Sequence, residues 1–233
     1  MPTTRRIEDF VDLLRGFAPE KVTSSSVLDL CLDTDIEDSS LSKYVHWQDS
    51  MYTRNLIYRD DLFEVMAVCW QKGQKTVLHT HNGQLGWMMV NRGIAEVTNF
   101  KWQGCNAAEG QNTAGLDCIA GATEIQLSRD QVETCGRGGQ VNVIDRVRTI
   151  HQVAVAGNEP VVSIHVYSRP IDSCVAFDTE SPRCYRRQLR YYSKFGDVLM
   201  TPADVTGLTA AEAKEPSTPL LSSQAALSSQ ADE

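Results

Sequence analysis

The chain has 233 residues, 42% of them hydrophobic and 22% charged, which is enough apolar material for one ordinary globular core. Its 30 acidic residues outnumber its 22 lysines and arginines, so the formal net charge is −8, and no long basic run concentrates positive charge. This composition argues against nucleic acid and anionic membranes as partners and favours a small soluble ligand.

The N-terminal stretch has no apolar run of signal-peptide length, and no window approaches the ~18 apolar residues needed to cross a bilayer. We therefore expect a cytoplasmic protein. The seven cysteines form an odd set without a CxxC spacing, which argues against a disulfide framework and against a cysteine zinc site. We expect them to be reduced thiols, several of them buried.

The first 45 residues carry helical signals. Residues 7–18 place apolar side chains at a spacing close to 3.6, which predicts an amphipathic helix. Residues 25–33 predict a second helix, which begins at the serines 24–26. We expect residues 1–45 to be an N-terminal helical segment that packs on the main domain.

From about residue 50 the sequence changes to short β-type runs bounded by Gly, Asn and Pro. "VNRGIAEV" predicts a hairpin that turns at Asn91 to Gly93, because Asn and Gly tolerate the positive φ of tight turns. The pattern predicts a mainly β fold, a β-sandwich or jelly-roll barrel, over residues 46–200. The predicted strands are 62–70, 84–91, 94–102, 139–145, 151–156 and 160–168.

Two segments lack a strand pattern. Residues 103–122 are rich in Gly, Asn and Ala, and we expect an irregular excursion between strands there. Residues 201–233 are rich in Ser, Ala and Gln with few bulky apolar side chains, which predicts a disordered tail.

Four of the five histidines lie in strand-like runs of the predicted β domain. "VLHTHNGQLGW" places His79 and His81 two residues apart, and alternate residues of a strand face the same side. His151 lies in "RTIHQVAV" and His165 in "VSIHVYS". A His-x-His pair with a distant third histidine offers three neutral nitrogen ligands, which suit iron, zinc, copper or nickel.

The spacing around this pair resembles the first motif of the cupin superfamily, a jelly-roll barrel with a central metal. Five residues separate Gly73 from His79, four separate His81 from Gly86, and six separate Gly86 from Gly93. In that motif a ligating glutamate usually stands where this chain has Gly86. A site with three histidines and no carboxylate leaves the metal its full charge and spare coordination positions.

Longer blocks resemble the cysteine dioxygenases over roughly residues 45–196. These blocks are "MYTRNLI" (51–57), "VCWQKG" (68–73), "HTH" (79–81), "SIHVYSRPIDSCVAFD" (163–178) and "YYSKFG" (191–196). Members of that family are cytosolic non-haem iron enzymes that use O₂ to oxidise a thiol to a sulfinate. The resemblance implies Fe(2+) as cofactor, a small thiol and O₂ as partners, and a place in cysteine metabolism and taurine biosynthesis.

The resemblance also implies roles for individual residues. The implied iron ligands are His79, His81 and His151. A metal dication lowers the pKa of a thiol and binds it as the thiolate. Three neutral imidazole ligands do not cancel the positive charge of the metal. Arg54, with Tyr52 beside it, would hold the substrate carboxylate, which a guanidinium matches with two parallel hydrogen bonds.

His165 and Tyr167 are the implied catalytic residues, placed beside the iron and the substrate. The tyrosine hydroxyl would lie on the side of the pocket where thiolate and oxygen meet. Ser163 would support His165 from behind.

Two departures from the family bear on these roles. Animal cysteine dioxygenases have a cysteine, cross-linked to the tyrosine, where this chain has Gly86, so we expect Tyr167 to be unmodified. Arg169 stands where those enzymes have the first proline of Ser-Pro-Pro, and we expect this exchange to alter a pocket wall and with it the preferred thiol.

The leading interpretation is a monomeric dioxygenase that converts L-cysteine to cysteine sulfinate. One alternative is a dioxygenase of another small thiol acid such as 3-mercaptopropionate, although relatives of that kind tend to have Gln where Arg54 stands. Another is a cupin that binds a metal or small ligand without catalysis. A zinc hydrolase also uses three histidine ligands, but it needs a general base, and the sequence shows no carboxylate placed for that role.

Overall fold

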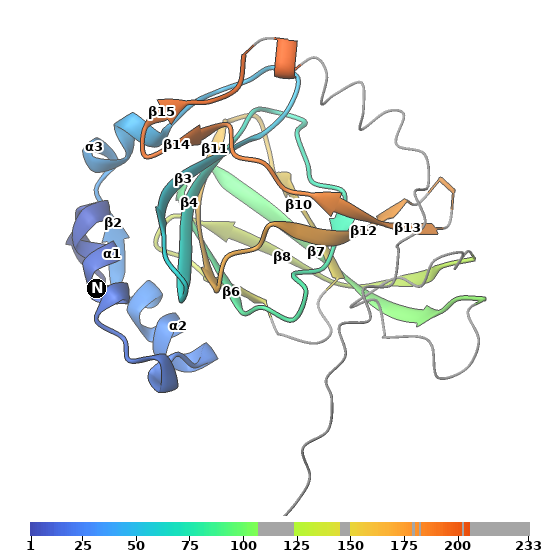
Figure 1. Cartoon of the computed structure of the whole chain (residues 1–233), viewed down its shortest axis with the longest axis horizontal. Helices are drawn as coiled ribbons and strands as arrows, with labels where there is room; N and C mark the ends of the chain where they lie inside the picture. Colours follow the sequence, from blue (N-terminus) through green and yellow to red (C-terminus); the bar gives the residue numbers. More distant parts are fainter. Residues whose placement is uncertain (107–123, 145–149, 179, 182, 202, 206–233) are drawn as a thin grey trace, which may run out of the picture.

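The computed structural model describes residues 1–106, 124–144, 150–178, 180–181, 183–201 and 203–205. Two β-sheets face each other, and the N-terminal helices lie against the outer side of one of them (Figure 1). Within the described part of the chain, no helix is long and apolar enough to cross a membrane.

The N-terminal elements include both helices that the sequence predicts. These elements are β1 (Thr3–Arg5), α1 (Ile7–Arg15), η1 (Pro19–Lys21), α2 (Ser24–Leu32), β2 (Thr34–Ile36), α3 (Asp38–Leu41) and η2 (Ser42–Tyr44). A capping box starts α2: Thr23 Oγ1 accepts from the Ser26 amide at 3.1 Å, and Ser26 Oγ accepts from the Thr23 amide at 3.0 Å. The serine-rich start signal is therefore a true helix cap.

The strands form one sheet of seven and one of six. In spatial order the first comprises β15 (Asp197–Val198), β14 (Ser193–Lys194), β3 (Thr53–Arg59), β4 (Phe63–Trp70), β11 (Val161–Ser168), β6 (Gly86–Arg92) and β9 (Asn142–Ile144). The second comprises β13 (Arg183–Gln188), β12 (Ser173–Asp178), β5 (Leu78–His79), β10 (Ile150–Val155), β7 (Ile94–Gly104) and β8 (Gln126–Gly136). The mainly β jelly-roll prediction is confirmed, with two facing sheets in place of one continuous closed barrel.

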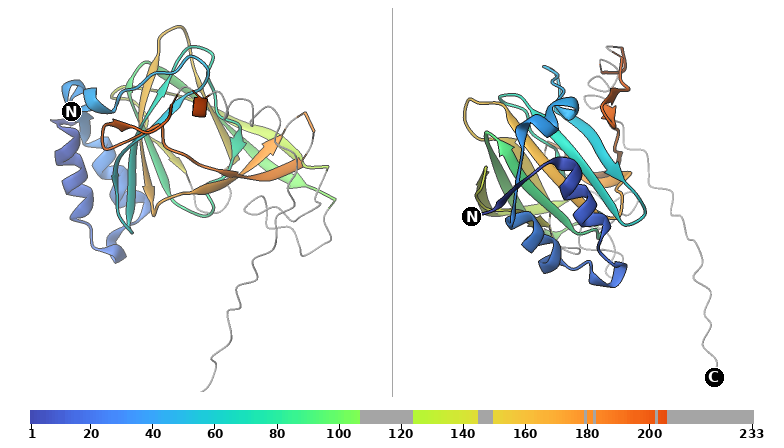
Figure 2. Two further views of the ribbon diagram at one scale, coloured as in Figure 1. Left: turned by 45° about the horizontal axis from the view of Figure 1, so that its top comes forward. Right: turned by 90° about the vertical axis from the view of Figure 1, so that its left-hand side faces the viewer.

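Strand β4 is buried along its whole length because both faces of its sheet are covered. Phe63 and Val65 face outward and pack in one cluster with Phe10 and Leu14 of α1. Met66 and its alternate neighbours face inward, toward the other sheet. Figure 2 shows from two further sides that the helices cover the sheet that contains β3 and β4.

The predicted hairpin at Asn91 to Gly93 is wrong. A turn does lie there, with Gly93 at φ 73°, but β6 pairs with β11 and β9 whereas β7 pairs with β10 and β8. The turn thus carries the chain from one sheet to the other. A Cβ on Gly93 would come within 2.5 Å of the Pro160 carbonyl oxygen, so close backbone approach also requires glycine at this corner.

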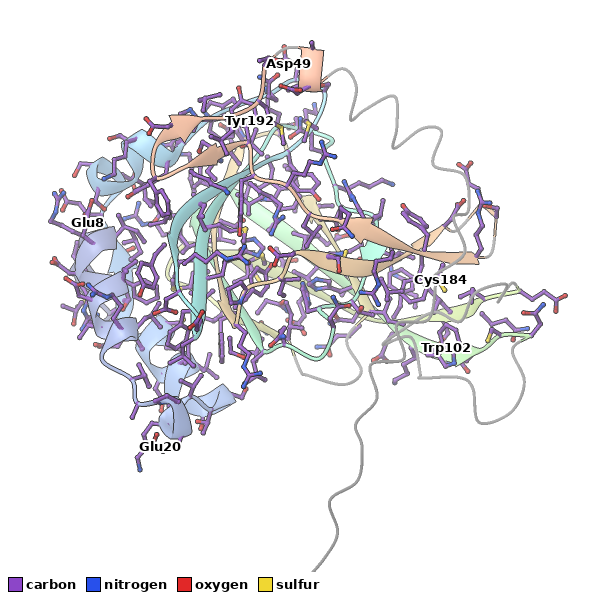
Figure 3. The ribbon with its side chains drawn as sticks, viewed as in Figure 1. Glu8, Glu20, Asp49, Trp102, Cys184 and Tyr192 are labelled. Atoms are coloured by element: carbon purple, nitrogen blue, oxygen red, sulfur yellow. The ribbon has the colours of Figure 1, made fainter. Side chains whose placement is uncertain are left out.

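Strand β8 is absent from the predicted set, and its direct pairing with β7 forms the long hairpin of the six-stranded sheet. Most of the expected excursion, 107–123, and most of the expected tail, 206–233, lie outside the described residues. The prediction that all cysteines are reduced is wrong at Cys184, which is disulfide-bonded. Figure 3 shows Cys184 and Trp102 at the end of the molecule away from the helices.

Adjacent leucines of α1 test how much the helical cover stabilises the sheet. Leu14 is fully buried, whereas Leu13 is 45% exposed. Leu14→Ala should lower the free energy of unfolding by ~2–5 kcal/mol, because it leaves a cavity between α1 and the sheet. Leu13→Ala should change it by less than ~1 kcal/mol. Urea unfolding measures both, and equal losses would show that the helix is not anchored by this face.

Candidate active site

Three histidines converge between the two sheets. Ligand atoms of His79, His81 and His151 all lie within 4.8 Å of one another, and the ring centroids are 4.7–4.9 Å apart. His79 ends β5 and stands opposite His151 of β10 in the antiparallel register, whereas His81 lies in the turn just past β5 rather than within a strand. The structure thus brings together the three histidines that the family resemblance implies as ligands, although the sequence placed His81 in a strand.

The surroundings of these imidazoles favour their neutral form. Burial lowers the pKa of His79 to about 4, and burial together with the other histidines holds the pKa of His81 and of His151 well below the ordinary value. The neutral form is the one that ligates metals. His79 Nδ1 lies 3.0 Å from the Val77 carbonyl oxygen, which leaves Nε2 for another partner.

Polar atoms at the centre of this cluster have no protein partner among the described residues. Both ring nitrogens of His151 and Nδ1 of His81 are buried without a hydrogen bond. An orphaned buried polar atom is costly, and a metal ion that binds one nitrogen of each ring removes part of that cost. The donor set, three neutral imidazoles and no carboxylate, therefore fits a transition metal.

His165 lies in the same cavity and belongs to a chain of hydrogen bonds instead of the metal cluster. The indole Nε1 of Trp70 donates to Ser163 Oγ at 2.9 Å, and Ser163 Oγ lies 2.9 Å from His165 Nε2. His165 Nδ1 lies 3.1 Å from the Tyr167 hydroxyl. Burial lowers the pKa of His165 to about 3 and raises that of Tyr167 far above its usual range, so both groups are neutral.

Arg54 points into this cavity from β3. Its side chain is 12% exposed, Nη1 donates to the Arg190 carbonyl oxygen at 3.4 Å, and the guanidinium lies 5.3 Å from the centre of the Tyr191 ring. Tyr52 also lines the cavity, stacked on Trp70 with ring centroids 4.5 Å apart. Every candidate site residue predicted from the sequence therefore borders one cavity.

The cavity encloses about 550 Å³, its open mouth included. Its lining also includes Arg187 of β13 and Cys174 of β12, which stand opposite each other in register and which the sequence argument missed. No Asp or Glu is among the described residues that line it, so its charged side chains are the guanidiniums of Arg54 and Arg187. A cavity with this lining attracts anions.

Gly86 packs against the ring of Tyr167. The two residues are opposite each other in β6 and β11, and a Cβ on Gly86 would lie 3.0 Å from two ring carbons. A glycine inside a strand marks such a close approach.

Arg169 lies outside the lining of the cavity. The side chain is exposed and is not among those that line the cavity, whose wall in this region includes Ile171 instead. The residue adopts φ 72°, and its amide donates to the Leu62 carbonyl oxygen at 2.7 Å, a bond that a proline cannot make. The Arg169 side chain therefore does not itself form the cavity wall, and an effect of this exchange on the preferred thiol stays a prediction.

A family model described as "Cysteine dioxygenase type I" matches residues 3–180. The chain belongs to this family. Among curated members of the cysteine dioxygenase family, the human "Cysteine dioxygenase type 1" is 25% identical over 206 residues, which cover 87% of this chain and 93% of that protein. The rat protein of the same name is 26% identical, with the same coverage of both chains. The zebrafish protein is 23% identical over 82% of this chain and 88% of its own.

Two solved structures show a distant likeness to this cysteine dioxygenase family member. A protein with a double-stranded β-helix domain from Klebsiella pneumoniae gives a TM-score of 0.40 at 16% identity and covers 56% of this chain and 82% of its own. A cupin 2 domain-containing protein from Halorhodospira halophila gives a TM-score of 0.37 at 19% identity, and the match covers 58% of this chain and 76% of that protein. Likenesses at these scores carry no further conclusion.

The histidine cluster makes a prediction about metal content. Replacement of His81 or His151 by Ala should weaken binding of a divalent transition metal by ~tenfold or more, because each removes one of three ligands. Metal per chain after dialysis, measured by plasma mass spectrometry, reports the loss. His46→Ala is the matched control, since His46 lies against Tyr192 and outside the cluster. Full metal retention in the cluster variants would contradict the assignment.

Proposed function

We propose that this protein is an iron(II)-dependent thiol dioxygenase that oxidises L-cysteine to cysteine sulfinate with O₂. The observation that carries the proposal is the meeting of three neutral imidazoles and a guanidinium in one cavity. The two features match the two ends of cysteine, because its thiol is a metal ligand and its carboxylate is a partner for arginine. Family membership supports the same reaction class.

His79, His81 and His151 are the residues that would hold the iron. Bound iron supplies a positive centre that favours the thiolate over the thiol, together with the redox chemistry that dioxygen requires. The chain's own contribution is to keep the three imidazoles neutral through burial and to leave the remaining coordination positions open to substrate.

Arg54 is proposed to bind the substrate carboxylate. At most one hydrogen on each of its two terminal nitrogens is directed at Arg190 or Glu64, so other N–H groups stay available for a fork. The absence of carboxylates from the described lining leaves the substrate's own carboxylate as the anion that this side of the cavity receives. A second guanidinium, that of Arg187, also lines the cavity.

His165 and Tyr167 are proposed to hold the proton that the reacting groups need. When His165 Nε2–H donates to Ser163 Oγ, the serine hydroxyl can donate to the Val68 carbonyl oxygen 3.4 Å away, and Nδ1 accepts from Tyr167. In the other tautomer the histidine donates at Nδ1, and the tyrosine proton turns toward the cavity. The pair can thus present either a lone pair or a proton at the Tyr167 oxygen. We propose that Tyr167 does this unmodified, because Gly86 has no thiol to join to it.

Two other assignments compete with this one. A dioxygenase of another thiol acid such as 3-mercaptopropionate would use the same residues but would not need room for an amine. A zinc hydrolase would need a general base near the metal, and the described lining contains no Asp or Glu for that role. The observations therefore favour a thiol acid, with cysteine as the leading candidate.

The test of this function is sulfinate formation by anaerobically reconstituted iron protein with cysteine, cysteamine and 3-mercaptopropionate. We expect O₂ uptake and sulfinate in equal amounts with cysteine. A protein that binds metal but consumes no O₂ with any of the three thiols would be a non-enzymatic cupin, and the proposal would be rejected.

Arg54→Ala tests the carboxylate partner. It should lower kcat/KM for cysteine at least ~tenfold, because loss of a partner from a desolvated ion pair costs ~2–5 kcal/mol. Cysteamine, which lacks the carboxylate, should be a poor substrate of the unmutated protein and nearly indifferent to the change. Arg54→Lys should recover only part of the loss, since an ammonium cannot form the planar fork. If cysteamine were oxidised better than cysteine, the amino-acid assignment would be wrong.

Tyr167→Phe tests the hydroxyl. It should lower kcat for cysteine more than it changes KM, because a group used mainly during the reaction affects the transition state most. Steady-state kinetics measure both constants. The intact mass of the purified chain, measured after reduction of the disulfide at Cys184, should also show no loss of hydrogen from a thioether. A cross-linked mass, or an unchanged kcat, would contradict this role.

A further inference from the structure

Glu64 is a fully buried carboxylate that the proposed reaction does not use. It lies in the apolar strand β4 with 0% exposure, opposite Tyr167 in the pairing with β11. It shares the inward face of β4 with Met66 and Val68, two cavity-lining residues. An ionised carboxylate in such a place is costly unless charges and donors surround it. Its partners therefore indicate why it is there.

Both oxygens of Glu64 have partners from separate parts of the chain. Oε2 accepts from the Ile171 amide at 3.3 Å and lies 4.0 Å from Arg54 Nη2. Oε1 accepts from the Tyr191 hydroxyl and lies 3.7 Å from Arg59 Nη1. Burial raises the pKa of this carboxyl, while the positive charges of Arg54 and Arg59 oppose that change. The carboxylate is thus fixed in place between two guanidiniums.

The network continues outward to the surface and inward to the cavity. Arg59 donates to Asp172 through two nitrogens, at 2.8 and 2.9 Å, and to the Tyr191 hydroxyl at 2.8 Å. Tyr191 in turn presents its ring to the Arg54 guanidinium. Asp172, at the outer end, has a side chain that is 72% exposed. Of the carboxylates in this chain of contacts, Glu64 is the one that faces Arg54 directly.

We propose that Glu64 is a positioning residue that fixes the angle at which Arg54 meets the substrate. This inference rests on the proposed function, in which Arg54 binds the carboxylate of cysteine. Three contacts define the guanidinium: the Glu64 charge on one arm, the Arg190 carbonyl on the other, and the Tyr191 ring. Since the Glu64 contact is 4.0 Å long, it orients the arm without consuming all its hydrogen-bond donors.

Removal of the Glu64 charge leaves Arg54 and Arg59 as two like charges beside one tyrosine. The substrate carboxylate would still meet a cation, so binding would persist, but the thiol at its other end would no longer be held at one orientation. Loss of orientation lowers the rate of the reaction more than it lowers affinity. A positioning role therefore predicts an effect on kcat that disappears when Arg54 is absent.

The experiment is a double-mutant cycle with Glu64→Gln and Arg54→Ala in iron-loaded protein. Glu64→Gln should lower kcat for cysteine about tenfold and change the anaerobic Kd for cysteine, measured by calorimetry, less than about threefold. Cysteamine oxidation should change less than about twofold. In the Arg54→Ala background Glu64→Gln should have less than about twofold further effect on cysteine turnover, because the two residues act as one unit.

Asp172→Asn is the matched control, since it removes the same charge from the same network at the end away from Arg54. It should leave kcat for cysteine within about twofold of the unmutated value. Tyr191→Phe is the second variant in case Glu64→Gln does not fold: it removes the hydroxyl that binds Glu64 but keeps both the carboxylate and the ring beside Arg54. It should reduce kcat for cysteine in the same direction while cysteamine stays unaffected. Thermal unfolding and iron content establish that each variant is folded and loaded.

Equal losses for cysteine and cysteamine, or an undiminished loss in the Arg54→Ala background, would show a purely structural role and overturn the inference. Unchanged cysteine turnover in Glu64→Gln would overturn it as well. If Arg54→Ala impairs cysteine oxidation and the Glu64 variants do not, this inference fails and the proposed function stands. If the unmutated protein oxidises none of the thiols, the proposed function itself fails.

Discussion

The register between β5 and β10 is the constraint on which the site depends. It places His79 opposite His151 across neighbouring strands, and the turn after β5 brings His81 against both rings. The facing sheet, carrying His165 and Tyr167 on β11, closes over them and removes water. A shift of one residue in this register would turn His151 to the other face of its sheet and dismantle the cluster. The same strand pairing therefore determines both the burial of the three histidines and their closeness to one another.

Charge is distributed around the cavity in two layers. The lining carries guanidiniums and neutral imidazoles, whereas the buried carboxylate, Glu64, lies behind Arg54. A carboxylate in the lining would weaken the attraction of the cavity for anions and would cancel part of the charge of a bound metal. Placed one contact further out, it stabilises the arginine while the cavity stays attractive to anions. This arrangement explains how one glutamate can be buried beside an anion-binding site.

Sequence reasoning succeeded where a pattern is local. The 3.6 spacing in α1, the apolar runs of β4 and β11 and the His-x-His spacing depend on neighbouring residues. It failed where the answer depends on the other sheet: a Gly93 turn has the same signal whether it joins paired strands or crosses between sheets. Strand β8 was missed because most of its residues are exposed and polar, so no apolar run marks it. A glutamate inside the apolar run "LFEVMAV" was a usable signal for Glu64, but its partners come from distant segments and only the fold identifies them.

Gly86 shows how one substitution in a family motif can be absorbed by packing. At this position a carboxylate would be a further metal ligand and a thiol would be within reach of Tyr167, whereas glycine offers neither. Its missing side chain lets the Tyr167 ring approach to a distance at which any Cβ would have to displace it. The tyrosine is then held by this contact on one side and by the hydrogen bonds through His165 and Ser163 to Trp70 on the other. These contacts hold the ring from both sides, and they keep the hydroxyl 3.1 Å from His165 Nδ1.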